Sequence, residues 1–63
     1  MQPADPETVR AAVEKWTSLF ELERNTGTKT NRSRNAVLQS LNDADLVAVA
    51  VALRQSGYLG GSK

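Results

Sequence analysis

Eight consecutive residues without a polar side chain, Leu46–Leu53, restrict the possible folds of this chain more than any other stretch. They read Leu-Val-Ala-Val-Ala-Val-Ala-Leu, a pattern compatible with a buried strand or with a buried helix. The flanking residues favour the helix. Asn42 can cap a helix whose first turn carries Asp43 and Asp45, where the helix dipole favours negative charge, and Gly57 is a typical left-handed stop. The sequence therefore predicts a helix of about twelve residues here.

An earlier and longer segment predicts an amphipathic helix from Pro6 to Asn25. Asp5-Pro6-Glu7 combines a capping side chain, a proline suited to the first helical position and an acidic first turn. Gly27 can supply the left-handed residue that ends the helix. Apolar residues then recur at spacings of three and four, as expected for one buried stripe: Val9, Ala12, Val13, Trp16, Leu19 and Phe20. Core packing is the expected role of Trp16 and Phe20.

A shorter helix is predicted between these two, from Arg32 to Leu41. Its apolar side consists of Val37, Leu38 and Leu41, and Thr30 or Asn31 can cap it after a loop rich in hydroxyl groups. The connection to the last helix through Asn42 is short, so a sharp angle is expected between them. The predicted fold is all-α, with one domain over residues 1–63 and disordered tails at 1–4 and 60–63.

The length of the chain bears on its assembly. A chain of 63 residues buries only about 60% of its unfolded surface, and it contains neither Cys nor His for a disulfide or a structural zinc site. Association with a second copy is the remaining source of stability, so we expect a homodimer. Val47 and Val51 form a second apolar side on the last helix, and Leu22 lies off the stripe of the first. These three residues are the predicted dimer interface.

The charge distribution suggests a binding surface in the middle of the chain. Net charge is +1, yet the four residues Arg24, Lys29, Arg32 and Arg34 occur between Arg24 and Asn42 without any carboxylate. Basic residues at a helix start, beside free backbone N–H groups, favour a phosphate ligand. The predicted nucleic-acid-binding residues are Arg24, Lys29, Thr30, Asn31, Arg32 and Arg34. In the alternative interpretation these cations are solvated, or pair with Glu21, Glu23 or carboxylates of a partner.

Several other kinds of function fit the sequence poorly. The absence of His and Cys removes two common catalytic residue types, so neither an enzyme nor a metal site is expected. Gly27-Thr28-Lys29-Thr30 lacks the full P-loop spacing. The last two helices resemble a helix-turn-helix in outline, but the last one is almost without the polar residues that a recognition helix needs.

The sequence therefore predicts a small, non-enzymatic, dimeric regulator without a cofactor, which contacts DNA or RNA through the basic loop and the start of the second helix. The alternative is a protein-interaction module that binds and modulates a partner protein through apolar helix surfaces. The longest apolar run, of eight residues, is far below the ~20 that span a membrane. The N-terminus lacks the basic and then apolar pattern of a signal peptide, so we expect a cytoplasmic protein.

Overall fold

The computed structural model describes residues 3–59, which form three helices and no strand. They are α1 (Pro6–Thr26), α2 (Asn31–Gln39) and α3 (Asp43–Gln55). The all-α, three-helix prediction is confirmed. α1 ends one residue later than predicted, and α2 is displaced toward the N-terminus at both ends. Residues 1–2 and 60–63, which belong to the tails expected to be disordered, lie outside the described residues.

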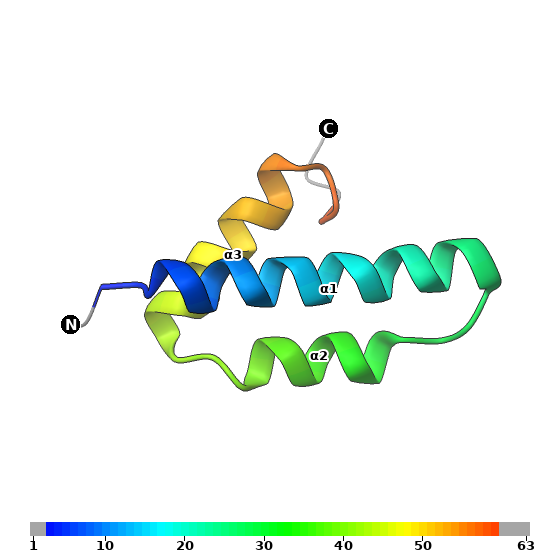
Figure 1. The fold of residues 1–63 in the computed structure, drawn as a ribbon, viewed down its shortest axis with the longest axis horizontal. Coiled ribbons are helices and arrows are strands. Elements are labelled where there is room, and N and C mark those ends of the chain that lie inside the picture. The colour runs from blue at the N-terminus through cyan, green and yellow to red at the C-terminus, as the bar shows by residue number, and fades with distance from the viewer. Residues whose placement is uncertain (1–2, 60–63) are drawn as a thin grey trace.

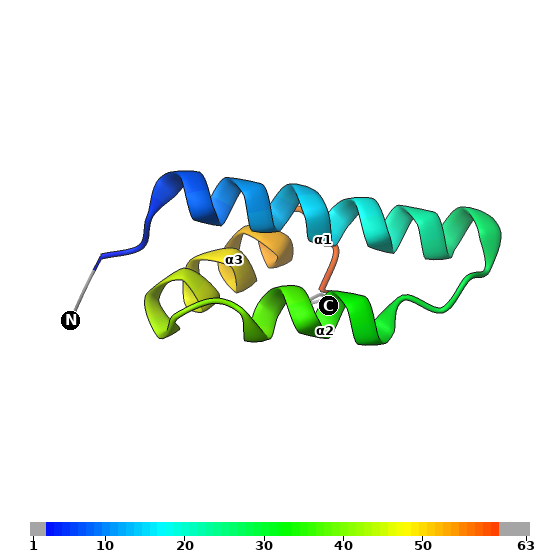
Figure 2. The ribbon, with the colours of Figure 1, turned by 60° about the horizontal axis from the view of Figure 1, so that its bottom comes forward.

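The helices are arranged as a hairpin with a third helix across it. α1 and α2 lie side by side and run in opposite directions, and the loop of residues 27–30 joins them (Figure 1). α3 begins near the N-terminal end of α1 and crosses it at an angle, as Figure 2 also shows. The connection between α2 and α3 comprises only residues 40–42, which accounts for the sharp turn predicted there.

The core forms where α3 meets the apolar stripe of α1. Ala12 and Trp16 of α1 are buried against Val49 and Leu53 of α3. Partly buried apolar residues complete this cluster: Val9, Val13, Phe20, Val37, Leu38, Leu41 and Tyr58. The predicted stripe of α1 and one side of α3 thus pack together, because burying both removes apolar surface from water.

Both ends of α3 carry the predicted caps. The Asn42 side chain accepts a hydrogen bond from the backbone N–H of Asp45 at 2.8 Å, which satisfies one free donor of the first turn. At the other end Gly57 has a φ of 86°, and the N–H of Tyr58 donates to the carbonyl of Leu53 at 2.9 Å. This is the Schellman arrangement. Each end of the apolar helix is therefore fixed by its own hydrogen bonds.

Asp45 makes a contact that its position in the first turn did not predict. Its carboxylate is buried and accepts the backbone N–H of Asp5 at 2.7 Å, across 40 positions of sequence. Asp5 stands at the cap position of α1, but its own carboxylate accepts the Thr8 hydroxyl at 2.6 Å and makes no capping bond to the backbone. Asp45 therefore joins the start of α3 to the start of α1.

Within residues 3–59, no helix combines the length and the apolar character needed to cross a bilayer.

Candidate functional site

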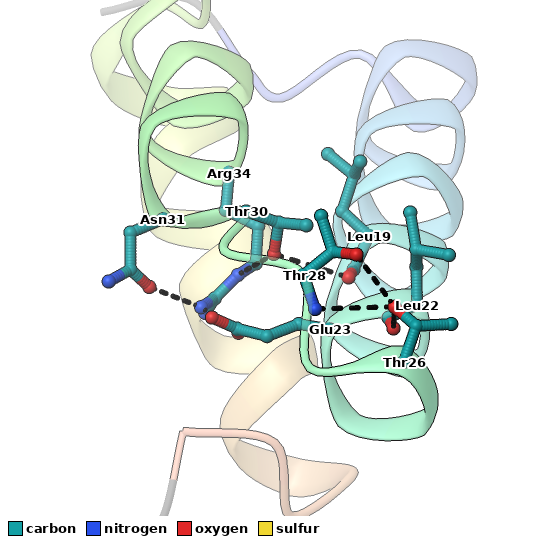
Figure 3. Close-up of polar contacts among 8 residues, drawn as sticks. All are labelled: Leu19, Leu22, Glu23, Thr26, Thr28, Thr30, Asn31 and Arg34. Carbon is teal, nitrogen blue, oxygen red and sulfur yellow. Dashed lines mark hydrogen bonds and ion pairs between the residues drawn. The ribbon is translucent and has the colours of Figure 1, made fainter.

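The predicted basic segment gathers at one end of the molecule. Arg24 lies in the last turn of α1, Lys29 and Thr30 in the loop, and the other three predicted residues in the first turns of α2. Figure 3 shows this end, where the α1 C-terminus faces the α2 N-terminus. The fold therefore brings the six residues into one region, although their side chains take very different directions.

Arg34 was predicted to bind nucleic acid, but its side chain points inward rather than toward solvent. Only 15% of its side chain is accessible to solvent. Its guanidinium donates to the Glu23 carboxylate, to the Asn31 side-chain oxygen and, at 3.1 Å, to the Thr30 hydroxyl (Figure 3). The same group lies over the rings of Trp16 and Phe20, 5.0 and 5.3 Å from their centroids. Arg34 therefore joins α2 to α1.

Thr30 is buried as well, so its hydroxyl is not presented to solvent. The hydroxyl donates to the Leu19 carbonyl of α1 at 3.2 Å and accepts from Arg34. Thr30 occupies the cap position of α2, but its side chain makes no capping bond to the helix backbone. Its side chain thus links the two helices of the hairpin rather than capping one of them.

The three aromatic residues of the chain form one cluster beside this linkage. The rings of Trp16 and Phe20 are stacked, with centroids 5.5 Å apart and planes 10° from parallel. Tyr58 meets both rings edge-on, at 6.0 and 5.4 Å, and its hydroxyl donates to Glu21 at 3.3 Å. The core role predicted for Trp16 and Phe20 is confirmed. Because Trp16 is buried, it offers no platform for stacking a nucleic-acid base.

Of the four central cations, two form ion pairs and two form none within the described residues. Arg24 forms an exposed ion pair with Glu21 at 3.9 Å, and Arg34 pairs with Glu23. These pairs match the alternative that the sequence left open. Lys29 and Arg32 are exposed and form no ion pair within residues 3–59. The positive surface is therefore smaller than the sequence indicates.

Apolar side chains are exposed on the outer side of α3. Val47 and Val51, one turn apart, are 62% and 47% exposed, and partly buried Ala44 and Ala48 lie next to them. Leu22 of α1 is also exposed, but it lies two positions, or about 200° around the helix, from the core residue Phe20. It therefore lies on the far side of α1 and does not extend the surface formed by the two valines.

A second apolar feature, which the sequence did not reveal, is an open groove of about 670 Å³ between α1 and α2. None of its lining residues belongs to α3. They are Thr8, Ala11, Ala12, Lys15, Leu19, Ser33, Ala36, Val37, Ser40 and Leu41. The sequence signal was a series of small residues beside the apolar stripe of each helix, but small residues on a helix surface are too common to predict a groove alone.

Comparisons with protein-family models, with curated proteins and with solved structures found no match for this chain. Within residues 3–59, the two apolar surfaces and the unpaired cations Lys29 and Arg32 are the features that bear on function. Among residues 3–59 no group of three or more acidic side chains is placed to hold a metal ion.

Proposed function

We propose that this chain is a small non-enzymatic interaction module that binds an amphipathic helix of a partner protein in the groove between α1 and α2. The apolar groove that α3 leaves uncovered is the observation that carries the proposal. We propose further that the module works as a homodimer, joined through the exposed Val47 and Val51 of α3. Both surfaces act by burying apolar area, which drives most protein association.

The lining of the groove has the chemistry suited to a helix of a partner protein. Helices pack at interaxial distances of 8–10 Å that depend on the side chains between them, and Ala11 and Ala36 supply small side chains on the two walls. Leu19, Val37 and Leu41 offer apolar surface for a stripe of residues at helical spacing. Lys15 also lines the groove and favours a partner helix with a carboxylate at the matching position.

A library of displayed helical peptides tests this proposal directly. Selection on the wild-type protein is expected to enrich peptides with apolar residues at i, i+3, i+4 and i+7 and an acidic residue beside them. Ala36→Glu places a charge in the groove at an exposed helical position, and it should reduce the affinity of the selected peptides by about tenfold or more.

Asn35→Glu is the matched control for that measurement. It adds the same charge at the neighbouring exposed position of α2, outside the groove, and should leave peptide affinity nearly unchanged. Peptides that bind the Ala36→Glu protein as tightly as the wild type would show that the groove is not the binding site.

Nucleic-acid binding is a second candidate function, supported by the two exposed and unpaired cations Lys29 and Arg32 of the described loop and helix. They lie near the start of α2, where the helix dipole also attracts anions. Two copies in a dimer would present four such cations. The contacts would be with phosphate groups, which exposed Lys and Arg side chains bind without reading the base sequence.

Titration of labelled duplex DNA and single-stranded RNA at two salt concentrations tests this candidate. Four phosphate contacts predict a slope of log affinity against log salt of roughly −3.5 on duplex DNA. The double variant Lys29→Ala/Arg32→Ala should flatten that slope, whereas Arg10→Ala/Lys15→Ala, with the same loss of charge on α1, should retain it. Absence of binding to both nucleic acids at ~50 mM salt would exclude this function.

A further inference from the structure

We infer that two copies of the chain associate through α3 in an antiparallel arrangement about a twofold axis. The inference rests on the proposed homodimer and specifies its geometry. Ala44, Val47, Val51 and Arg54 recur at spacings of three, four and three along α3, which is the pattern of a helix–helix seam. The two valines at its centre are the most exposed large apolar residues of the three helices.

The charges at the two ends of this stripe determine the direction of the second helix. Asp43 stands at the start of α3 and Arg54 in its last turn, and both side chains are exposed. Neither forms an ion pair within residues 3–59. If Val47 faces Val51 of the second copy, the start of each helix lies beside the end of the other. Asp43 then meets Arg54 of the second copy, and the twofold axis produces this pair twice.

A parallel arrangement would bring like charges together at each end, and it would also align the two helix dipoles. Antiparallel packing opposes the dipoles and places a carboxylate beside a guanidinium at both ends. A surface with opposite charges at its two ends and the same apolar residues between them is complementary to itself under a twofold rotation. That self-complementarity identifies the occupant as a second copy of this chain rather than an unrelated helix.

The seam is short, and this predicts a weak dimer. From Asp43 to Arg54 it spans about 16 Å of helix, so two such helices bury less area than a stable standard-size interface. Dissociation is therefore expected at micromolar concentrations. Sedimentation of the wild-type protein between about 1 μM and 1 mM should show a mass that rises with concentration toward twice that of the chain.

Charge reversal tests the direction of the pairing. Asp43→Arg alone and Arg54→Asp alone each place like charges together twice, and each should weaken dimerisation by about tenfold or more. An equimolar mixture of the two variants should form a heterodimer, because both of its end pairs then join a carboxylate to a guanidinium, whereas each variant paired with itself has like charges at both ends. The double variant Asp43→Arg/Arg54→Asp restores attraction at both ends and should regain dimerisation as a homodimer.

Single cysteines give an independent measurement that does not alter the helix start. The chain has no cysteine of its own, and Val47 and Val51 are both exposed, so Val47→Cys and Val51→Cys should each fold. In the antiparallel arrangement, mild oxidation of the mixed variants should crosslink position 47 of one copy to position 51 of the other faster than either variant crosslinks to itself. In a parallel arrangement each variant would crosslink best to itself, because equal positions face each other.

Two results would overturn the inference, and they differ in whether they also exclude the proposed homodimer. A wild-type protein that stays monomeric up to about 1 mM excludes the proposed homodimer together with its geometry. A wild-type dimer that both charge reversals leave intact, and whose single-cysteine variants crosslink to themselves, excludes the antiparallel α3 seam alone. In that case the dimer forms through another surface. Neither result affects peptide binding in the α1–α2 groove, which is measured separately.

Discussion

Arg34 illustrates how much one side chain contributes to a small core. Its planar guanidinium is only weakly hydrated, so it can stack on the rings of Trp16 and Phe20 and still donate hydrogen bonds at its edge. Glu23 supplies the opposite charge, and this reduces the cost of holding a cation at 15% exposure. A lysine could keep the charge, but it could not reproduce both the stacking and the forked donors.

Arg34 was predicted from the sequence to bind nucleic acid, and replacing it tests its structural role instead. Arg34→Ala should lower the free energy of unfolding by about 1–3 kcal/mol, because it removes the stacked cation and leaves the Glu23 carboxylate without its guanidinium partner. The free energy of unfolding of Arg34→Lys should lie between those of Arg34→Ala and the wild type. Urea unfolding followed by circular dichroism measures both.

Arg32→Ala is the matched control for the Arg34 variants. Arg32 lies two positions away in the same helix, is exposed and forms no ion pair within the described residues, so its loss should change stability by less than about 0.5 kcal/mol. Equal losses for Arg32→Ala and Arg34→Ala would mean that the stacked guanidinium does not stabilise the hairpin.

At the scale of an element, α3 is a short apolar helix whose two ends are fixed by hydrogen bonds. Asn42 caps its first turn, and Gly57 and Tyr58 close its last. A helix of 13 residues is marginal in isolation, so these end contacts and the packing against α1 together keep it folded. The Asp45–Asp5 hydrogen bond adds a connection from the first turn of α3 to the start of α1.

Asn42→Ala should cost about 0.5–2 kcal/mol, because it leaves the Asp45 N–H without its side-chain acceptor. Asn42→Asp keeps an acceptor at the same place and should retain most of the stability. Thermal unfolding at one low protein concentration compares the two variants. A loss for Asn42→Asp as large as that for Asn42→Ala would contradict a capping role.

Asp45→Ala should cost about 1–3 kcal/mol, since the backbone N–H of Asp5 loses its acceptor in a partly buried position. Hydrogen exchange should then accelerate in the first turn of α1 as well as in α3. Glu7→Ala removes an exposed first-turn carboxylate of α1 and serves as the control, with an expected loss of about a few tenths of a kcal/mol. If only the α3 amides exchanged faster, the connection to α1 would be energetically unimportant.

At the scale of the whole molecule, the fold is thin. Its shortest dimension is 16 Å against a longest one of 39 Å, so the molecule is less than two helix diameters of about 10–12 Å thick. Three helices in this arrangement leave apolar surface uncovered on both sides, in the α1–α2 groove and on the outer side of α3. The exposed Val47 and Val51 are a direct result of this thinness.

Self-association should therefore appear in the stability of the molecule. The midpoint of thermal unfolding is expected to rise with protein concentration, because the dimer forms only from folded chains. Val51→Glu should abolish this dependence without unfolding the monomer, since Val51 is already 47% exposed. Leu22→Glu, at a residue of 46% exposure on α1, should preserve it. Calorimetry at several protein concentrations measures the unfolding midpoint of both variants. If Leu22→Glu abolished the concentration dependence as Val51→Glu does, Leu22 would belong to the interface.

The sequence predicted the features that depend on neighbouring residues. The helices, the Asn42 cap, the Gly57 stop and the buried stripe through Trp16 follow from local chemistry and spacing. The environment of Arg34 did not follow, because Glu23 and Trp16 lie 11 and 18 positions away and reach it only after α2 folds back on α1. The Asp45–Asp5 hydrogen bond also depends on the assembled fold.

Trp16 is the only indole of this chain, and its surroundings make it an optical reporter of folding. It is buried, stacked on Phe20, met edge-on by Tyr58 and covered by the Arg34 guanidinium. Side chains from α1, from α2 and from the turn after α3 thus surround one chromophore. Its fluorescence emission should shift to longer wavelength when any of these segments detaches. Assembly of the native fold can therefore be followed in the unlabelled wild-type protein.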